Sequence, residues 1–166
     1  MQPRVYKNDF VPGLSRRDLH EMAVAYAVVE FERRGRVPSM WLIVAGAEVT
    51  WIETPWEDDR EKEWSTRALR GVMREMGARA YSFITEAWVA SYRTDIDDPE
   101  ILPSERPENE RDEVLVIMTY DLTSEFEATR FLVTPRKNGN NLLGPRDDET
   151  FKEFTLEGRM FNLLVR

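Results

Sequence analysis

An acidic side chain inside an apolar stretch is the feature of this sequence closest to a reactive group. Residues 78–92 (ARAYSFITEAWVASY) alternate like a long strand, and Glu86 shares one face of it with Ile84, Trp88 and Ala90. A buried, unpaired carboxylate is costly, so Glu86 must be paired, hydrogen-bonded, protonated or at an open face. We therefore expect Glu86 to be either a paired structural acid or the first member of a functional site.

A metal-dependent hydrolase or nuclease would need a second carboxylate near Glu86. Glu53 and Glu127 are the candidates, because both lie within predicted strands. Neither is followed two residues later by the lysine of an acid-x-Lys nuclease pattern, since Pro55 and Thr129 occupy those positions. A carboxylate metal-dependent hydrolase or nuclease that uses Glu86 is therefore the alternative interpretation, and the sequence leans away from an enzyme.

Other catalytic groups are scarce. His20 is the only histidine, which excludes a multi-histidine metal site within one chain, and we expect it at the surface or in helix packing. The chain has no cysteine, so thiol catalysis and disulfides are excluded. It lacks the GxSxG elbow and both standard phosphate-binding glycine motifs. The acidic run 95–100 lacks the glycine and glutamate of a calcium loop and predicts a solvated loop. We expect no cofactor and no metal.

The charge balance indicates which classes of partner the protein could bind. The formal net charge is −8 and the isoelectric point is near 4.9, which makes binding to nucleic acid unlikely because such binding depends on Lys and Arg. No segment approaches the roughly 20 apolar residues of a membrane span. We expect a soluble, cytoplasmic protein without a membrane partner.

Five tryptophans fall on neighbouring predicted elements. Such rings are enriched at protein interfaces, so they predict a binding surface, for which we select Trp51, Trp56 and Trp88. The alternative is an aromatic core between helices and sheet, to which the other two, Trp41 and Trp64, would also contribute.

Two helices are predicted by apolar spacing and by their end signals. The first begins at Ser15, where Ser15 and Asp18 form a capping box, and it ends at Gly35. The second follows Trp56, with acidic residues in its first turn, and ends at Gly77.

Strand patterns surround these helices. Residues 40–44 and 48–54 predict a hairpin with Gly46 at positive φ, and residues 113–121 and 125–134 predict another hairpin. Residues 78–92 form the long strand, and residues 160–165 are a plausible last strand. The connection through the second helix to residue 78 could be a right-handed crossover that makes one pair of strands parallel.

These elements predict a single domain over residues 1–166. Residues 1–14 are expected to be an extended N-terminal arm, residues 93–112 an acidic proline-containing loop, and residues 135–150 a second loop. The fold class is α+β, with two helices packed on one face of a mostly antiparallel sheet of five to six strands.

Several motifs together resemble a family of small uncharacterised prokaryotic and phage proteins of α+β type. They are a Trp-bearing hairpin, a Pro-Trp and acidic helix start, a Ser/Thr-Glu-Ala-Trp strand and a C-terminal Glu-Gly-Arg-Met segment, carried here by Pro55, Trp56, Asp58, Arg60, Lys62, Glu86, Trp88, Arg106, Glu113 and Glu157 to Met160. The resemblance runs from about Pro38 onward. It implies a single domain and brings no activity with it.

Taken together, the residues favour a non-enzymatic accessory or protein-interaction protein. Its partner would be a protein, either a second copy of the chain in a homo-oligomer or another protein, and a phage or mobile element is a fitting source. An exposed strand edge or a Trp-lined patch would form the contact surface.

Overall fold

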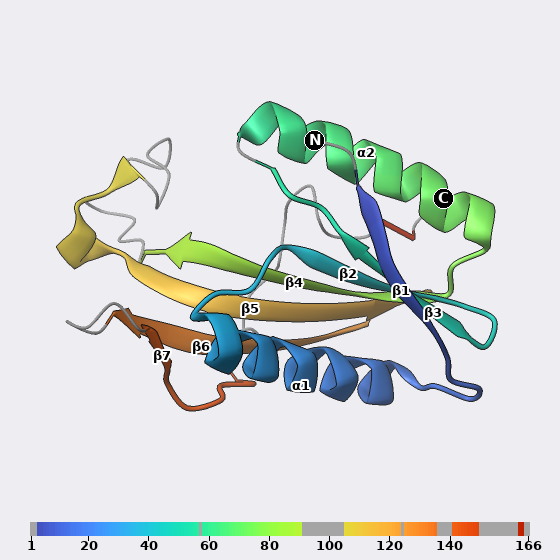
Figure 1. Cartoon of the computed structure of the whole chain (residues 1–166), viewed down its shortest axis with the longest axis horizontal. Coiled ribbons are helices and arrows are strands. Elements are labelled where there is room, and N and C mark those ends of the chain that lie inside the picture. Colours follow the sequence, from blue (N-terminus) through green and yellow to red (C-terminus); the bar gives the residue numbers. More distant parts are fainter. Residues whose placement is uncertain are drawn as a thin grey trace.

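The computed structural model describes residues 3–56, 58–90, 105–123, 125–135, 141–149 and 163–164. In chain order its elements are β1 (Arg4–Phe10), α1 (Arg16–Arg34), β2 (Met40–Ala45), β3 (Glu48–Glu53), α2 (Asp59–Met76), β4 (Ala80–Val89), a short 3₁₀ helix (Glu108–Glu110), β5 (Asp112–Asp121), β6 (Phe126–Pro135) and β7 (Asn141–Leu143). Figure 1 shows how the two helices and the long strands are arranged.

Both helices begin and end at the residues that the sequence predicts. Ser15 and Asp18 form the full capping box of α1, and Gly35 closes the helix in the left-handed conformation at φ 72°. Asp58 caps α2 by accepting from the backbone N–H of Glu61 at 2.8 Å, and Gly77 ends it. The buried face of α1 includes Ala27 and Phe31, whereas Val29 is exposed.

In the described part of the chain the sheet has seven strands in the order β1-β3-β2-β4-β5-β6-β7, and every neighbouring pair is antiparallel. The α+β class and the two hairpins are confirmed, with Gly46 at φ 58° in the first. The expected count of five to six strands is too low. The expected last strand lies almost wholly outside the described residues, so it does not account for the difference.

The two additional strands form in segments that lack strand patterns. β1 lies in the predicted arm 1–14, which is extended as expected but pairs with β3. Its sequence RVYKNDF is too polar to predict a strand. β7 lies in the predicted loop 135–150 and has three residues that pair with the end of β6. Both strands depend on a neighbour that only the folded sheet supplies. Of the predicted acidic loop 93–112, residues 93–104 lie outside the described part, and β5 begins at Asp112.

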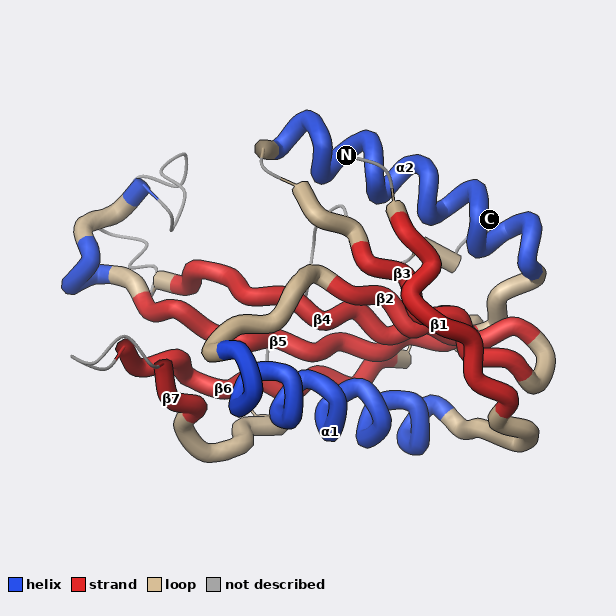
Figure 2. The backbone as a smooth tube through the Cα atoms, viewed as in Figure 1, coloured by secondary structure: helices blue, strands red, loops and turns tan. Residues whose placement is uncertain are grey.

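The helices lie on opposite faces of the sheet, so the prediction that both pack on one face is wrong. Residues of α1 pack against Met40, Leu42 and Val44 of β2, whereas residues of α2 share a cluster with Trp41 and Ile43 from the same strand. Successive strand residues point to opposite faces, so the two clusters lie on two sides of one sheet. Figure 2 shows α1 and α2 separated by the strands.

Strand direction explains this placement. The connection β1–α1–β2 crosses over β3, and the connection β3–α2–β4 crosses over β2, in the same direction along the sheet. Because β1 and β3 run antiparallel, two crossovers of the same hand must place their helices on opposite faces. The strands that each crossover joins are parallel but not adjacent, so the expected parallel pair does not occur as neighbours.

Candidate functional site

Glu86 is bound by backbone. Its Oε1 accepts a hydrogen bond of 2.6 Å from the N–H of Val37, just before β2. Burial raises the pKa of Glu86, the Val37 N–H opposes that rise, and the charge of Glu113 adds to it. Of the interpretations open at the start, the geometry matches a hydrogen-bonded, half-buried structural acid, although its partner is an amide rather than an arginine.

The other two candidate acids lie on the same face but do not converge on Glu86. Met40 stands opposite Glu53 on one side and opposite Ile84 on the other, so β2 separates Glu53 from β4. Glu53 pairs instead with Arg4 at 3.1 Å. In the described part of the chain, no group of three or more Asp, Glu or His side chains could hold a metal ion.

Glu127 is distant in a different direction. On β5, the residue opposite Glu86 is Leu115 and the residue opposite Glu127 is Thr119. Four residues along a strand span roughly 13 Å, which is too far for both carboxylates to bridge one metal ion. The carboxylate of Glu127 is held by Arg17 at 2.7 Å.

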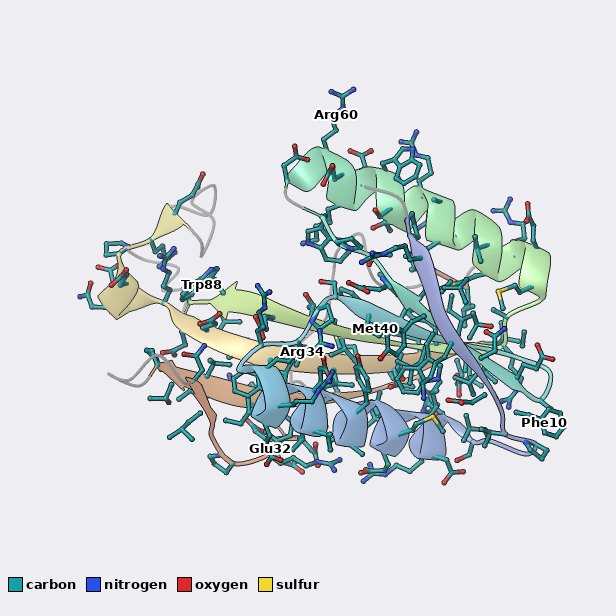
Figure 3. The ribbon with its side chains drawn as sticks, in the orientation of Figure 1. Phe10, Glu32, Arg34, Met40, Arg60 and Trp88 are labelled. Atoms are coloured by element: carbon teal, nitrogen blue, oxygen red, sulfur yellow. The ribbon has the colours of Figure 1, made fainter. Side chains whose placement is uncertain are left out.

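The three selected tryptophans have different environments. Trp51 is buried in the α1-side cluster, where its Nε1 donates to Asp9 at 2.8 Å. Trp56 is half-buried and packs near Phe83 on the α2 side. Trp88 is exposed at the far end of β4, with the Arg111 guanidinium 4.3 Å from its ring (Figure 3). They do not share a patch, since Trp51 and Trp56 belong to opposite faces of the sheet.

The strongest polar cluster surrounds His20, which is 1% exposed between α1 and the sheet. Its Nδ1 lies 2.9 Å from the hydroxyl of Thr119, and its Nε2 lies 2.8 Å from the hydroxyl of Thr129. Thr119 also contacts Ser82 at 2.6 Å, and Thr129 donates to Asp148. A chain of hydrogen bonds therefore runs from β4 through β5, α1 and β6 to the segment after β7.

Which group donates and which accepts in each hydrogen bond of this series can be worked out from Asp148, the acid at its end. Burial acts to raise the pKa of Asp148, but hydrogen bonds from Arg146 and Thr129 outweigh it and hold the pKa below its usual range. An ionised carboxylate only accepts, so the Thr129 hydroxyl donates to it and its oxygen accepts from Nε2–H of His20. Burial lowers the pKa of His20, so the ring is neutral and Nδ1 accepts from Thr119. The Thr119 oxygen then accepts from Ser82.

A cavity of about 460 Å³ opens beside this chain and is lined by His20, Glu127, Asp148 and Arg17 among others. Its charges are paired, since Glu127 binds Arg17 and Asp148 binds Arg146 at 2.9 Å. Both ring nitrogens of His20 are also occupied. These contacts give each of His20, Glu127 and Asp148 a partner within the fold, and the hydrogen bonds of His20 join α1 to the sheet.

The sequence interpretation left His20 either at the surface or in helix packing and did not find its partners; the structure buries it in helix packing. A sequence signal for these partners did exist. Ser82, Thr119 and Thr129 are hydroxyl residues that each interrupt an apolar strand on the face that α1 covers. Asp148 carries no such signal, because it lies in a segment predicted to be a loop.

None of the described helices is long and apolar enough to cross a membrane.

The sequence analysis expected an exposed strand edge but did not locate it, and the outer edge of β1 is such an edge. Among the described residues, β1 pairs only with β3, and its side chains are exposed except for the half-buried Asp9. Val5, Tyr6 and Phe10 expose 65%, 53% and 75% of their surface. Figure 3 shows Phe10 at the outer end of this strand, far from Trp88. The pairing with β3 shifts between Val5 and Lys7, so Tyr6 is the extra residue of a β-bulge.

No protein-family model matches the chain, and no curated protein or solved structure shows significant similarity to it. The resemblance to small prokaryotic and phage proteins therefore stays a prediction. Any functional conclusion must come from the geometry of the chain itself.

The first prediction concerns the protonation of His20. Because it is the only histidine, its ring ¹⁵N resonances are unambiguous. We expect the Nε2–H tautomer at neutral pH and a native-state midpoint below 6.5, since burial disfavours the charged ring. A depressed pKa also means that the stability contributed by neutral His20 is present above 6.5 and is lost as pH falls towards the native midpoint. An Nδ1–H tautomer would contradict the donor order.

The second prediction concerns Thr129. In Thr129→Val the buried Nε2–H of His20 loses its acceptor and the Asp148 carboxylate loses one of its donors, so the free energy of unfolding should fall by about 1–3 kcal/mol. Urea unfolding measures this change. Thr123→Val is the matched control, because it removes a hydroxyl bond to Asp121 at an exposed turn, and its effect should be under about 1 kcal/mol. Equal losses of stability in the two variants would contradict a buried series of hydrogen bonds around His20.

The third prediction concerns Glu86. Its raised pKa means that its stabilising contribution is full at low pH and is lost as pH rises through the native pKa. Glu86→Gln keeps an oxygen that accepts from Val37 but cannot ionise. Relative to wild type, the variant should gain stability from about pH 4 to pH 7, as measured by urea unfolding. Glu32→Gln, at an exposed position on α1, is the control and should show a smaller change. A loss of more than about 2 kcal/mol at neutral pH would instead indicate a required charge.

Proposed function

We propose that this protein is a non-enzymatic protein-interaction protein and that the outer edge of β1 is its contact surface. The observation that carries the proposal is the open edge of a seven-residue strand that exposes three large apolar side chains. Backbone N–H and C=O groups along such an edge are a template for a further strand.

The edge also has features that select a partner. Lys7 and the bulge at Tyr6 both oppose indiscriminate strand pairing, because a charge and a local twist disfavour a flat, regular neighbour. A partner must therefore match the bulge. The other edge of the sheet is β7, whose three residues offer much less backbone. These contrasts support β1 as the surface for a specific interaction.

The chemistry of the polar groups supports an interaction role over catalysis. The acids Glu53, Glu86 and Glu127 each bind a different partner within the fold. Both nitrogens of His20 serve the hydrogen-bond chain. A reaction that used any of these groups would first have to break a bond that holds the fold together.

The fourth prediction tests this proposal with the double variant Val5→Lys and Phe10→Lys. Adding two charges to the edge should weaken association by at least tenfold, because each lysine must be desolvated when a strand pairs there. The side chains are exposed, so the free energy of unfolding should change by less than about 1 kcal/mol. Sedimentation velocity and retention of partner proteins by the immobilised chain measure the association.

Val29→Lys is the matched control, because Val29 lies on α1 and is 62% exposed, close to the 65% of Val5. It should retain wild-type association. The proposal is refuted if wild type is monomeric and retains no protein that the double variant loses.

A further inference from the structure

The faces to which the β1 side chains point can be assigned from their contacts. Arg4 binds Glu53, Lys7 lies 4.1 Å from the Trp51 ring centre, and Asp9 accepts from Trp51. Trp51 belongs to the cluster under α1, so these three residues point to the α1 face. Tyr6, the bulged residue, also points to this side, where burial raises the pKa of Tyr26 on α1 and the electrostatic interaction with Tyr6 adds to that rise.

The remaining side chains of β1 point to the α2 face. Val5 stands opposite Ile52, which belongs to the cluster under α2. Asn8 and Phe10 stand opposite Thr50 and Glu48, which share the face of Ile52 by alternation. The bulge therefore places two successive residues, Tyr6 and Lys7, on the same face and reverses the alternation beyond them.

This reversal selects one register for antiparallel pairing of two β1 strands. A two-fold axis perpendicular to the sheet keeps the α1 faces of both copies on one side, so opposed residues must point to the same face. Arg4 opposite Asp9, Val5 opposite Asn8 and Tyr6 opposite Lys7 satisfy this rule throughout. A slip by one residue opposes Arg4 to Phe10 or to Asn8, and a slip by two opposes Lys7 to Asn8 or Val5 to Tyr6. Each of these slips breaks the rule.

The charges agree with the same register. Arg4 of one copy meets Asp9 of the other, and no pair brings like charges together. Among the described residues, the contacts of Asp9 with Lys7 and Trp51 both use Oδ2, so Oδ1 can accept from a second arginine. Arg4 uses Nη2 for Glu53 and is 64% exposed, so the rest of its guanidinium can reach across the edge.

We propose that the partner of the β1 edge is a second copy of this chain, paired antiparallel about a two-fold axis through the bulge in this register. The proposal rests on the proposed function, because it uses the same edge. It joins two seven-stranded sheets into one and covers the exposed backbone of β1 in both copies. The matching bulges give the selectivity that a flat edge lacks.

The experiment uses the natural absence of cysteine. Val5→Cys and Asn8→Cys are prepared separately, light scattering establishes the oligomeric state of each, and the two are then mixed in equal amounts under mild oxidation. Directly opposed residues have Cβ atoms about 4.5–5.5 Å apart, near disulfide range, so the mixture should form the heterodisulfide at least tenfold faster than either variant alone. In the single variants the equivalent cysteines are three residues out of register, or roughly 10 Å apart.

A mixture of Val5→Cys and Phe10→Cys is the register control and should cross-link slowly, because Phe10 lies diagonally from Val5 in this pairing. A monomer in light scattering at the concentration of the cross-linking experiment overturns the proposal, and so does a dimer in which the Val5–Phe10 mixture cross-links faster. If the chain is monomeric but the double lysine variant still loses a retained protein, self-pairing fails while the β1 edge remains the contact surface. If neither is seen, both proposals fail.

Discussion

The structure depends on covering both faces of the central strands. β2, β4 and β5 carry apolar side chains on each side, and a sheet that is buried on both faces needs a layer on each. The antiparallel direction of β1 and β3 provides those layers, because crossovers of one hand that start from opposed strands place α1 and α2 on opposite sides. The position of β1 beside β3 therefore sets which face of the sheet each helix covers.

The α1 layer contains the chain of hydrogen bonds around His20, which forms a polar seam in an apolar core. His20 is buried between Thr119 and Thr129, and the seam ends at the ionised Asp148. In an apolar interior each of these groups would be destabilising alone, but a chain in which every hydroxyl donates in one direction satisfies them all. The seam links strands that are distant in sequence and joins them to α1.

The helices cover the faces of the sheet but not its edges, so the outer backbone N–H and C=O groups of the edge strands have no strand partner in the described part of the chain. At one end β7 is short, whereas at the other β1 presents a full strand with exposed apolar side chains. The bulge at Tyr6 gives this edge an individual shape. An edge of that kind can pair with a further strand.

The sequence by itself determined the elements whose signals are local. Ser15, Gly35, Gly46 and Gly77 mark helix ends and a turn because capping and positive φ are properties of a few adjacent residues. Tertiary structure alone decided the rest. The polar strand β1 exists only because β3 lies beside it, and the face that each helix covers follows from strand order. Likewise, Glu86 meets the backbone of Val37 rather than another acid because the register of β2 and β4 sets its neighbours. Such pairings join residues far apart along the chain, and no local pattern specifies them.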